Sequence, residues 1–238
     1  MQELKAALFD VDGTLLDTSE FIFQAYEYTL DKFGLAPKTR SEMATLIGKP
    51  LETCYELLAP GVHIAGIADI KDIKDIRELA KELAKTHRYF QGEHLDLSKP
   101  YPGTATALEA LKIAGIKIAA VTTRQRSSSV KTLELAGISE FIDFVVALED
   151  VTHLKPDPEP VLKALAYLNV QPVDAIMTGD SDVDIFAGKN AGTATVGVTY
   201  GFHGVRIADS NPDYVIDSIG EIIPVVLPEV SECPVSRT

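Results

Sequence analysis

The chain has 238 residues, of which 22 are Lys or Arg and 35 are Asp or Glu, giving a formal net charge of −13. Hydrophobic residues make up 46% and charged residues 24% of the sequence, which is the balance of a folded globular protein. An acidic chain without clustered Lys and Arg is not expected to bind nucleic acid or an anionic membrane surface. A small anionic substrate is not excluded, because a few local cations can bind one.

Cysteine content and apolar run length indicate where the protein resides. Only Cys54 and Cys233 are present, too few for a disulfide framework, and no C-x-x-C spacing typical of a zinc site occurs. No apolar run approaches the roughly 20 residues that span a bilayer, and the apolar stretch near the N-terminus runs directly into Asp10. We expect a cytoplasmic protein that does not associate with membranes and is a monomer or a weak homodimer.

Six short apolar segments are predicted to form buried strands. They are residues 4–9, 116–121, 144–148, 175–178, 194–198 and 214–216. Helical patterns lie between most of them, at residues 104–114, 127–136, 158–168 and 182–191. Gly137 and Gly192 follow two of these helices, where a C-terminal glycine is favoured. Repeated strand–helix–strand units predict an α/β fold with a parallel sheet and helices on both of its faces.

Residues 18–97 interrupt this alternation, because they show helical patterns only. Apolar side chains recur there at helical spacing in two stripes: Ile22, Tyr26, Leu30 and Phe33, and then Ile73, Ile76, Ala80, Leu83, His87 and Phe90. The sequence therefore predicts an α/β domain formed by residues 1–17 and 98–227, with residues 18–97 inserted as a helical domain. Residues 228–238 carry few anchoring side chains and are predicted to be a mobile tail.

Polar residues gather where the predicted strands end. They are Asp10, Asp12, Gly13 and Thr14 after the first strand, Thr122 and Thr123 after the second, Lys155 after the third, and Gly179, Asp180 and Asp184 after the fourth. The carboxyl ends of parallel strands meet at one edge of a sheet, so these groups are expected to converge. Clustered carboxylates repel one another unless a hard cation such as Mg²⁺ holds them. Carboxylates, hydroxyls and a lysine together indicate phosphoryl transfer through an aspartyl phosphate.

The same residues carry a family resemblance. The segment from Asp10 to Asp17, Asp-Val-Asp-Gly-Thr-Leu-Leu-Asp, resembles the first motif of the haloacid dehalogenase superfamily. Thr122 resembles the second motif, Lys155 the third, and the segment Gly-Asp-Ser-Asp-Val-Asp from position 179 the fourth. The motifs occur in the family's order, and residues 18–97 resemble its cap. The resemblance implies a Rossmann-like core with an inserted helical cap.

This resemblance also implies a role for each motif residue. Asp10 is expected to be the nucleophile, and Asp12 the general acid and later the base that activates water. Thr122 and Lys155 are expected to bind the oxygens of the transferring phosphoryl group. The expected cofactor is Mg²⁺, bound by Asp10, the main-chain carbonyl of Asp12 and Asp180, with Asp184 as a further ligand or directly behind the ligands.

Three more positions are predicted to contact the substrate, a small anionic phosphorylated molecule. Gly13 and Thr123 adjoin the first and second motifs. Lys49 lies in the segment Ile-Gly-Lys-Pro, which resembles the substrate-facing loop of the cap, and could pair with a second anionic group. For Arg124, which follows the two threonines, substrate contact and a solvent-facing loop position are both open.

Two positions indicate the reaction class within the family. Dehalogenases resemble this chain but lack a carboxylate two residues after the nucleophile, whereas the phosphatases have one, as Asp12 here. Members similar to β-phosphoglucomutase carry a cap histidine where this chain has Ile22. The resemblance therefore implies a phosphatase rather than a mutase.

The substrate stays open between two compact anions. The core resembles phosphoglycolate phosphatases, so a small phosphomonoester of this kind is the first expectation. Residues 155–161 and 187–193 look equally similar to pyrophosphatase-type relatives, so inorganic pyrophosphatase is the alternative. Sugar-phosphate phosphatase or phosphomutase comes next. A catalytically inactive binding protein is disfavoured, because Asp10, Asp12, Lys155 and Asp180 are all present.

Overall fold

The computed structural model describes residues 4–47, 49–58 and 73–228. The chain divides into two compact units, one formed by residues 1–17 with 100–238 and the other by residues 18–99. Strands β2 (Leu16–Asp17) and β3 (Lys99–Pro100) pair in a two-stranded sheet where the chain passes between the units. Almost all of the predicted mobile tail, residues 229–238, lies outside the described residues.

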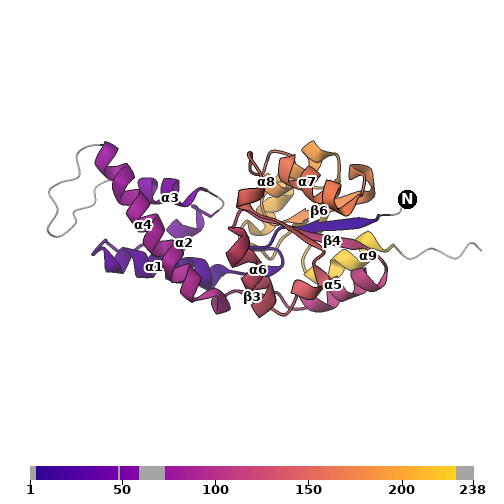
Figure 1. Ribbon diagram of the computed structural model, residues 1–238, viewed down its shortest axis with the longest axis horizontal. Helices are drawn as coiled ribbons and strands as arrows, with labels where there is room; N and C mark the ends of the chain where they lie inside the picture. Colours follow the sequence, from indigo (N-terminus) through magenta and orange to yellow (C-terminus); the bar gives the residue numbers. More distant parts are fainter. Residues whose placement is uncertain (1–3, 48, 59–72, 229–238) are drawn as a thin grey trace, which may run out of the picture. The chain divides into compact units, whose positions relative to one another are not determined.

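The first unit is built on a six-stranded parallel sheet (Figure 1). Its strands are β1 (Ala6–Phe9), β4 (Lys117–Val121), β5 (Phe144–Val146), β6 (Ala175–Gly179), β7 (Ala194–Val198) and β8 (Tyr214–Ile216). Their order across the sheet is β5-β4-β1-β6-β7-β8, so the chain winds in both directions from β1. This topology confirms the predicted α/β fold.

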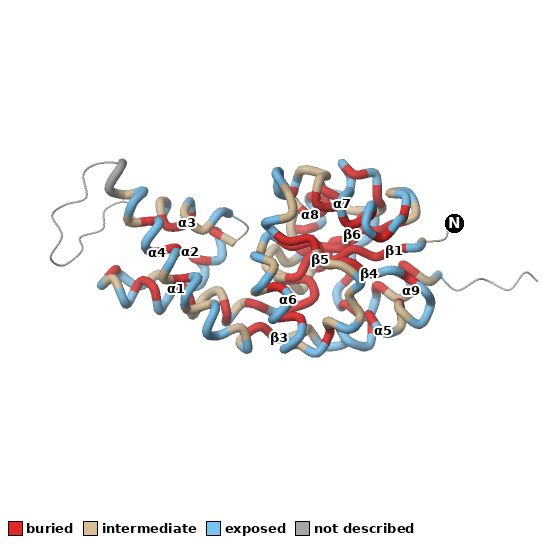
Figure 2. The backbone as a smooth tube through the Cα atoms, in the orientation of Figure 1, coloured by how far each residue is buried: buried red, intermediate tan, exposed pale blue. Residues whose placement is uncertain are grey.

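Both faces of the sheet are covered by helices, and the strand sequences show why. The four residues of β1 are fully buried and alternate between two apolar cores, Ala7 and Phe9 in one, Ala6 and Leu8 in the other. The first core is completed by α5 (Thr104–Ile113), α6 (Arg126–Leu135) and α9 (Ile222–Val226), the second by α7 (Glu159–Leu168) and α8 (Asp182–Ala191). Figure 2 shows the resulting buried layer within exposed outer helix surfaces.

Short 3₁₀ segments connect these elements. They are η1 (Leu95–Leu97), η2 (Ser139–Phe141), η3 (Leu148–Asp150), η4 (Pro172–Asp174), η5 (Gly204–Ser210) and η6 (Ile219–Glu221). Strand β5 ends two residues earlier than the apolar pattern predicted. The reason is that the Ala147 N–H donates to the carboxylate of Asp150 and η3 begins at once.

The second unit contains helices α1 (Ser19–Lys32), α2 (Arg40–Ala44), α3 (Leu51–Leu58) and α4 (Ile73–Glu93). The two apolar stripes fall on α1 and α4, whereas no stripe predicted α2 or α3. Tyr26 and Leu30 of α1 and Leu83 of α4 lie in its apolar core. His87 is buried there, where its Nδ1 lies 2.9 Å from the hydroxyl of Tyr55, and burial lowers the pKa of His87 to about 3. The histidine therefore serves packing, as its place on the stripe indicated.

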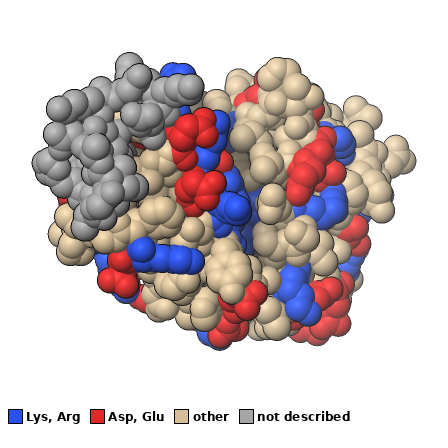
Figure 3. All heavy atoms as spheres, turned by 60° about the vertical axis from the view of Figure 1, so that its left-hand side comes forward, with Lys and Arg blue, Asp and Glu red and all other residues tan. Residues whose placement is uncertain are grey.

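Acidic and basic side chains of the described residues are interspersed on the face of the molecule in Figure 3. Within the described ranges, no helix combines the length and the apolar character needed to cross a bilayer.

The position of β1 at the centre of the sheet predicts a large cost for truncating it. Leu8→Ala should lower the free energy of unfolding by about 2–5 kcal/mol, because it removes a fully buried side chain that the surrounding elements cannot replace. Ile113→Ala, at a side chain that is 81% exposed, is the matched control and should change stability little. Denaturant unfolding of both variants measures the difference, and equal values would contradict this account of the core.

Candidate active site

Three neighbouring strands end at the same level of the sheet. Phe9 of β1 pairs in register with Ala120 of β4 and Thr178 of β6. Asp10, Thr122 and Asp180 each follow one of these strands directly, so their side chains start from adjacent points. The backbone N–H of Asp10 donates to the carbonyl of Thr178 at 2.9 Å, which continues the ladder into the site. The sheet therefore brings together the first, second and fourth motifs.

Lys155 lies at the centre of the cluster. Its Nζ donates to Oδ1 of Asp10 and to Oδ1 of Asp184, both at 2.6 Å, and to the carbonyl of Val121 at 3.0 Å. An ammonium group has three N–H donors, so these three acceptors use all of them. The Lys155 side chain is only 4% exposed, which makes this a buried ion pair with two carboxylates.

The loop that carries Lys155 is fixed by its own polar residues. The carboxylate of Glu159 accepts bonds from the backbone N–H groups of Thr152 and His153, both at 2.8 Å. Asp157 accepts from the backbone N–H of Glu159 at 2.9 Å, and Nδ2 of Asn190 donates to the carbonyl of Pro156 at 3.0 Å. These bonds hold the backbone on both sides of Lys155, so the ammonium group is placed before any substrate binds.

Asp184 and Asp180 are held by donors from the chain itself. Oδ2 of Asp184 accepts from the backbone N–H and the hydroxyl of Ser181, at 3.1 and 2.5 Å, in the capping box that begins α8. Oδ2 of Asp180 accepts from the backbone N–H of Phe202 at 2.7 Å. Each of the two carboxylates is therefore oriented by a donor other than Lys155.

Glycines allow the backbone to approach these carboxylates. A Cβ on Gly13, whose φ is +84°, would lie 2.5 Å from Oδ2 of Asp180. A Cβ on Gly179 would lie 2.2 Å from Cβ of Asp184, and one on Gly201 would lie 2.3 Å from Cβ of Asp180. Larger residues at these positions would displace the acidic side chains.

Burial perturbs the titration of the cluster. Burial raises the pKa of Asp10 to about 7; the charges of Asp184 and Asp12 add to the rise and Lys155 opposes it. Burial, together with the charges of Asp184 and Asp10, also raises the pKa of Asp180 well above its usual range. Burial alone would lower the pKa of Lys155, but the charges of Asp10 and Asp184 outweigh it and raise the pKa.

The three carboxylates suit a metal ion. Asp10, Asp180 and Asp184 each offer an oxygen, and these oxygens all lie within 4.8 Å of one another. Three buried acids with one lysine leave negative charge uncompensated, and oxygen ligands of this kind fit a hard divalent cation. His153, Asp157 and Glu159 form a second group of this size, but they are more exposed and bond to one another and to the loop backbone.

Asp12 lies beside the cluster with a different partner. Its Oδ1 accepts from Nη1 of Arg124 at 3.2 Å. The Asp12 side chain is 22% exposed and that of Arg124 is 12% exposed. Of the two positions that the sequence left open for Arg124, the structure therefore favours the one at the site.

The other residues predicted from the sequence differ in burial and in hydrogen-bond partners. Thr122 is buried and its hydroxyl accepts from the backbone N–H of Arg124 at 3.1 Å, whereas Thr123 is exposed. The N–H of Gly13 donates to the carbonyl of Leu16 at 2.8 Å. Lys49 belongs to the other unit, where its Nζ donates to the carbonyl of Thr45 at 2.6 Å. The substrate contacts expected of Gly13, Thr123 and Lys49 stay predictions.

The sequence did not reveal two of the polar contacts. The backbone N–H of Phe202 has no sequence signal, because every residue except proline has this donor. The capping box of Ser181 and Asp184 has a recognisable spacing, Ser-x-x-Asp, which could have indicated that Asp184 is tied to the start of α8.

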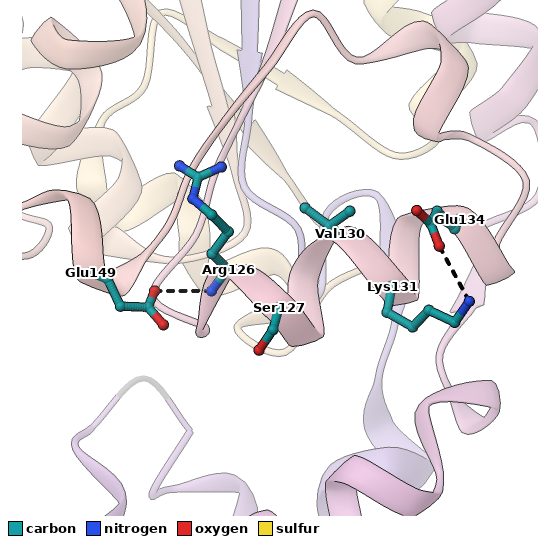
Figure 4. A pocket seen from close by; sticks show the side chains of 6 residues that line it. All are labelled: Arg126, Ser127, Val130, Lys131, Glu134 and Glu149. Carbon is teal, nitrogen blue, oxygen red and sulfur yellow. Dashed lines mark hydrogen bonds and ion pairs between the residues drawn. The ribbon is translucent and has the colours of Figure 1, made fainter.

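A hollow of about 640 Å³ lies alongside α6 (Figure 4). It is lined by Arg126, Ser127, Val130, Lys131, Glu134 and Glu149. The backbone N–H of Arg126 donates to Glu149 at 2.9 Å, and Lys131 pairs with Glu134 at 3.3 Å (Figure 4). None of the converging motif residues lines it, so we place the candidate active site at the strand ends instead.

Residues 7–198 match the model of the family described as "Haloacid dehalogenase-like hydrolase". The chain belongs to this family. It is 38% identical over 224 residues to Pyrophosphatase PpaX of Bacillus velezensis, covering 93% of this chain and 96% of that protein. It is 34% identical over 226 residues to the PpaX of Halalkalibacterium halodurans, covering 94% and 97%.

Solved structures agree with this assignment. A predicted phosphoglycolate phosphatase from Haemophilus somnus 129pt superposes with a TM-score of 0.83 at 26% identity, covering 94% of this chain and 99% of that one. A predicted phosphatase from Clostridium acetobutylicum gives 0.77 at 26% identity with the same coverage. The expected superfamily and a Rossmann-like α/β core are confirmed, and the chain is an enzyme of a phosphatase family.

The raised pKa values predict how the metal-free protein responds to pH. Between the unfolded value of 3.8 and the folded value of about 7, Asp10 binds more protons in the folded state than in the unfolded state. Stability of the chelator-treated protein should therefore fall as pH rises from about 4 to about 7. Asp180, whose pKa is raised as well, acts in the same direction.

Replacing one acid tests this account. Asp180→Asn should raise the melting temperature of the metal-free protein at pH 7 by about 2–4 °C, since it removes a repelling carboxylate. The same variant should lose most of the stabilisation that Mg²⁺ gives the wild type. Asp182→Asn removes an exposed acid two residues away and should behave as wild type. An unchanged Mg²⁺ response in Asp180→Asn would remove Asp180 from the ligand set.

Proposed function

We propose that this protein is a Mg²⁺-dependent phosphatase that hydrolyses its substrate through an aspartyl phosphate on Asp10. The observation that carries the proposal is the buried contact of Lys155 with Asp10 at 2.6 Å, at the edge where Asp12, Thr122 and Asp180 also lie. A carboxylate held by a cation at a strand end is placed to attack an electrophile that enters from this edge.

In the first step, a carboxylate oxygen of Asp10 forms a bond to phosphorus while the bond from phosphorus to the leaving oxygen breaks. Asp12 gives its proton to that leaving oxygen. Lys155, by releasing one of its three acceptors, and the hydroxyl of Thr122 bind the oxygens of the phosphoryl group and offset the charge that develops there. In the second step, Asp12 takes a proton from water, the water oxygen bonds to phosphorus, and the bond from Asp10 to phosphorus breaks.

The donor set at this site fits Mg²⁺. Asp10, Asp180 and the main-chain carbonyl of Asp12 would hold the ion. When bound, Mg²⁺ supplies positive charge that offsets the acids and the substrate oxygens. Asp184 was expected either as a further ligand or behind the ligands. Both of its oxygens already accept from Lys155 or Ser181, so we assign Asp184 to orienting Lys155.

Two substrates are supported by different observations. Inorganic diphosphate is favoured by curated relatives named pyrophosphatase, two of which are 38% and 34% identical to this chain over more than nine-tenths of its length. A small phosphomonoester such as phosphoglycolate was the first expectation from the motifs and is favoured by the solved structure from Haemophilus somnus. Both are compact and carry a second anionic group. We place diphosphate first, because the identity of those relatives is higher.

Phosphate release from a panel of substrates, with and without Mg²⁺, tests the function. Diphosphate, phosphoglycolate, sugar phosphates and nucleotides form the panel. We expect Mg²⁺-dependent turnover of diphosphate or phosphoglycolate above the others. Asp10→Asn keeps the size of the side chain but removes the attacking charge, so turnover should fall by about 10³-fold or more while the fold persists. Near-normal turnover in that variant would disprove the aspartyl-phosphate route.

The role of Asp12 has a separate test. A proton donor matters most when the departing oxygen is a poor leaving group. Asp12→Ala should therefore lower the rate on an alkyl phosphate at least about tenfold more than on p-nitrophenyl phosphate, whose phenol is acidic. Equal losses on the two substrates would show that Asp12 is not the donor, and would agree with a purely structural role.

Lys49 stays the candidate for substrate contact within residues 18–99, on the resemblance of its loop alone. A catalytically inactive binding protein would bind the same anions but release no phosphate from any substrate of the panel, with or without Mg²⁺.

A further inference from the structure

We propose that Arg124 binds the second anionic group of the substrate, which it reaches by exchanging Asp12 for that group. This inference rests on the proposed phosphatase function and narrows its substrate class. The favoured substrates would be compact phosphate esters or anhydrides whose leaving group carries a carboxylate or a phosphate.

Arg124 is presented by rigid elements. It lies in the turn between β4 and α6, where its backbone N–H donates to the hydroxyl of Thr122 at 3.1 Å. Its carbonyl accepts from the backbone N–H of Leu148 at 2.9 Å. At the other end of the side chain, Nη2 donates to the hydroxyl of Thr132 on α6 at 3.3 Å. The guanidinium group is therefore fixed at a defined place beside the second motif.

That place lies next to the path of the leaving group. Nη1 of Arg124 is 3.2 Å from Oδ1 of Asp12. Asp12 must contact the leaving oxygen to protonate it, so whatever is bonded to that oxygen passes close to the guanidinium group. A carboxylate two bonds away, or the remaining phosphate of a diphosphate, comes within reach of it.

The two cations of the site differ in how tightly they are held. Lys155 makes two carboxylate contacts of 2.6 Å and is 4% exposed. Arg124 is 12% exposed, and its contact with Asp12 is 3.2 Å, longer than the roughly 2.7–2.9 Å of a strong charge-assisted bond. Exchange therefore costs less at Arg124. The planar guanidinium also matches carboxylate and phosphate oxygens in pairs, which an ammonium group cannot do.

Exchange would serve turnover as well as binding. When the second anion takes the guanidinium group, the carboxyl group of Asp12 is left facing the leaving oxygen. When the leaving group departs with its anion, Arg124 returns to Asp12. A substrate with a single anionic group cannot displace Asp12 in this way. It should therefore gain neither the additional binding by Arg124 nor the release of Asp12 toward the leaving oxygen.

Matched substrates and variants test this proposal. Phosphoglycolate and ethyl phosphate both carry a two-carbon group on the leaving oxygen, but the second carbon is a carboxylate only in phosphoglycolate. Diphosphate carries a phosphate on that oxygen instead. Arg124→Gln should lower kcat/KM for phosphoglycolate and diphosphate about 10- to 100-fold more than for ethyl phosphate, the scale of a lost charge-assisted contact. For Arg124→Lys, kcat/KM on the substrates with a second anionic group should lie between the values of Arg124→Gln and the wild type. Lys131→Gln removes an exposed cation on α6 and should match the wild type.

Binding without turnover separates recognition from a structural effect. With Mg²⁺ present, calorimetry should show that Arg124→Gln strongly lowers the affinity for methylenediphosphonate and changes the affinity for methylphosphonate little. A loss with only one of the two substrates that carry a second anionic group would support the proposal and identify that group as carboxylate or phosphate. Equal losses on all three substrates, or none, would overturn it. Asp10→Asn distinguishes this failure, since activity surviving in that variant would overturn the proposed function itself.

Discussion

A buried ammonium group shared by two carboxylates is the interaction on which the rest of this site depends. Lys155 joins Asp10 at the end of β1 to Asp184 in the first turn of α8, and it also bonds the last carbonyl of β4. Removing one partner of such a buried pair leaves a charge uncompensated and costs about 3–5 kcal/mol. The contact that would position the nucleophile therefore also holds three elements of the fold together.

The balance of charge at the site contrasts with that of the whole chain. A net charge of −13 describes a surface that repels polyanions, yet Lys155 and Arg124 provide positive charge at the one edge where the acids converge. The negative charge of the acids exceeds the positive charge of these two cations, so a metal ion can still be bound. Local arrangement rather than total charge thus decides whether a small anion can bind, because screening limits the reach of surface charges to about 8–10 Å.

The sequence predicted the fold well where the signal is repetitive. Strands β7 and β8 have the predicted bounds, and the polar residues after β1, β4 and β6 converge as parallel topology requires. Strands β2 and β3 were missed, since two residues carry no periodicity. The backbone contact from Phe202 to Asp180 and the pairing of Arg124 with Asp12 also escaped prediction. They join positions 22 and 112 residues apart through geometry that no local pattern encodes.

The central place of β1 has a consequence for how the chain assembles. Ala7 pairs with Ile118 on one side and Ile176 on the other, so the first strand of this sheet to be synthesised waits for partners more than 100 residues away. Residues 18–99 form a contiguous unit and can close on themselves earlier. Non-local strand pairing is slow, and an unpaired apolar strand is prone to aggregate. Synthesis therefore favours completion of the inserted helices while the strand that carries the nucleophile is still without a sheet.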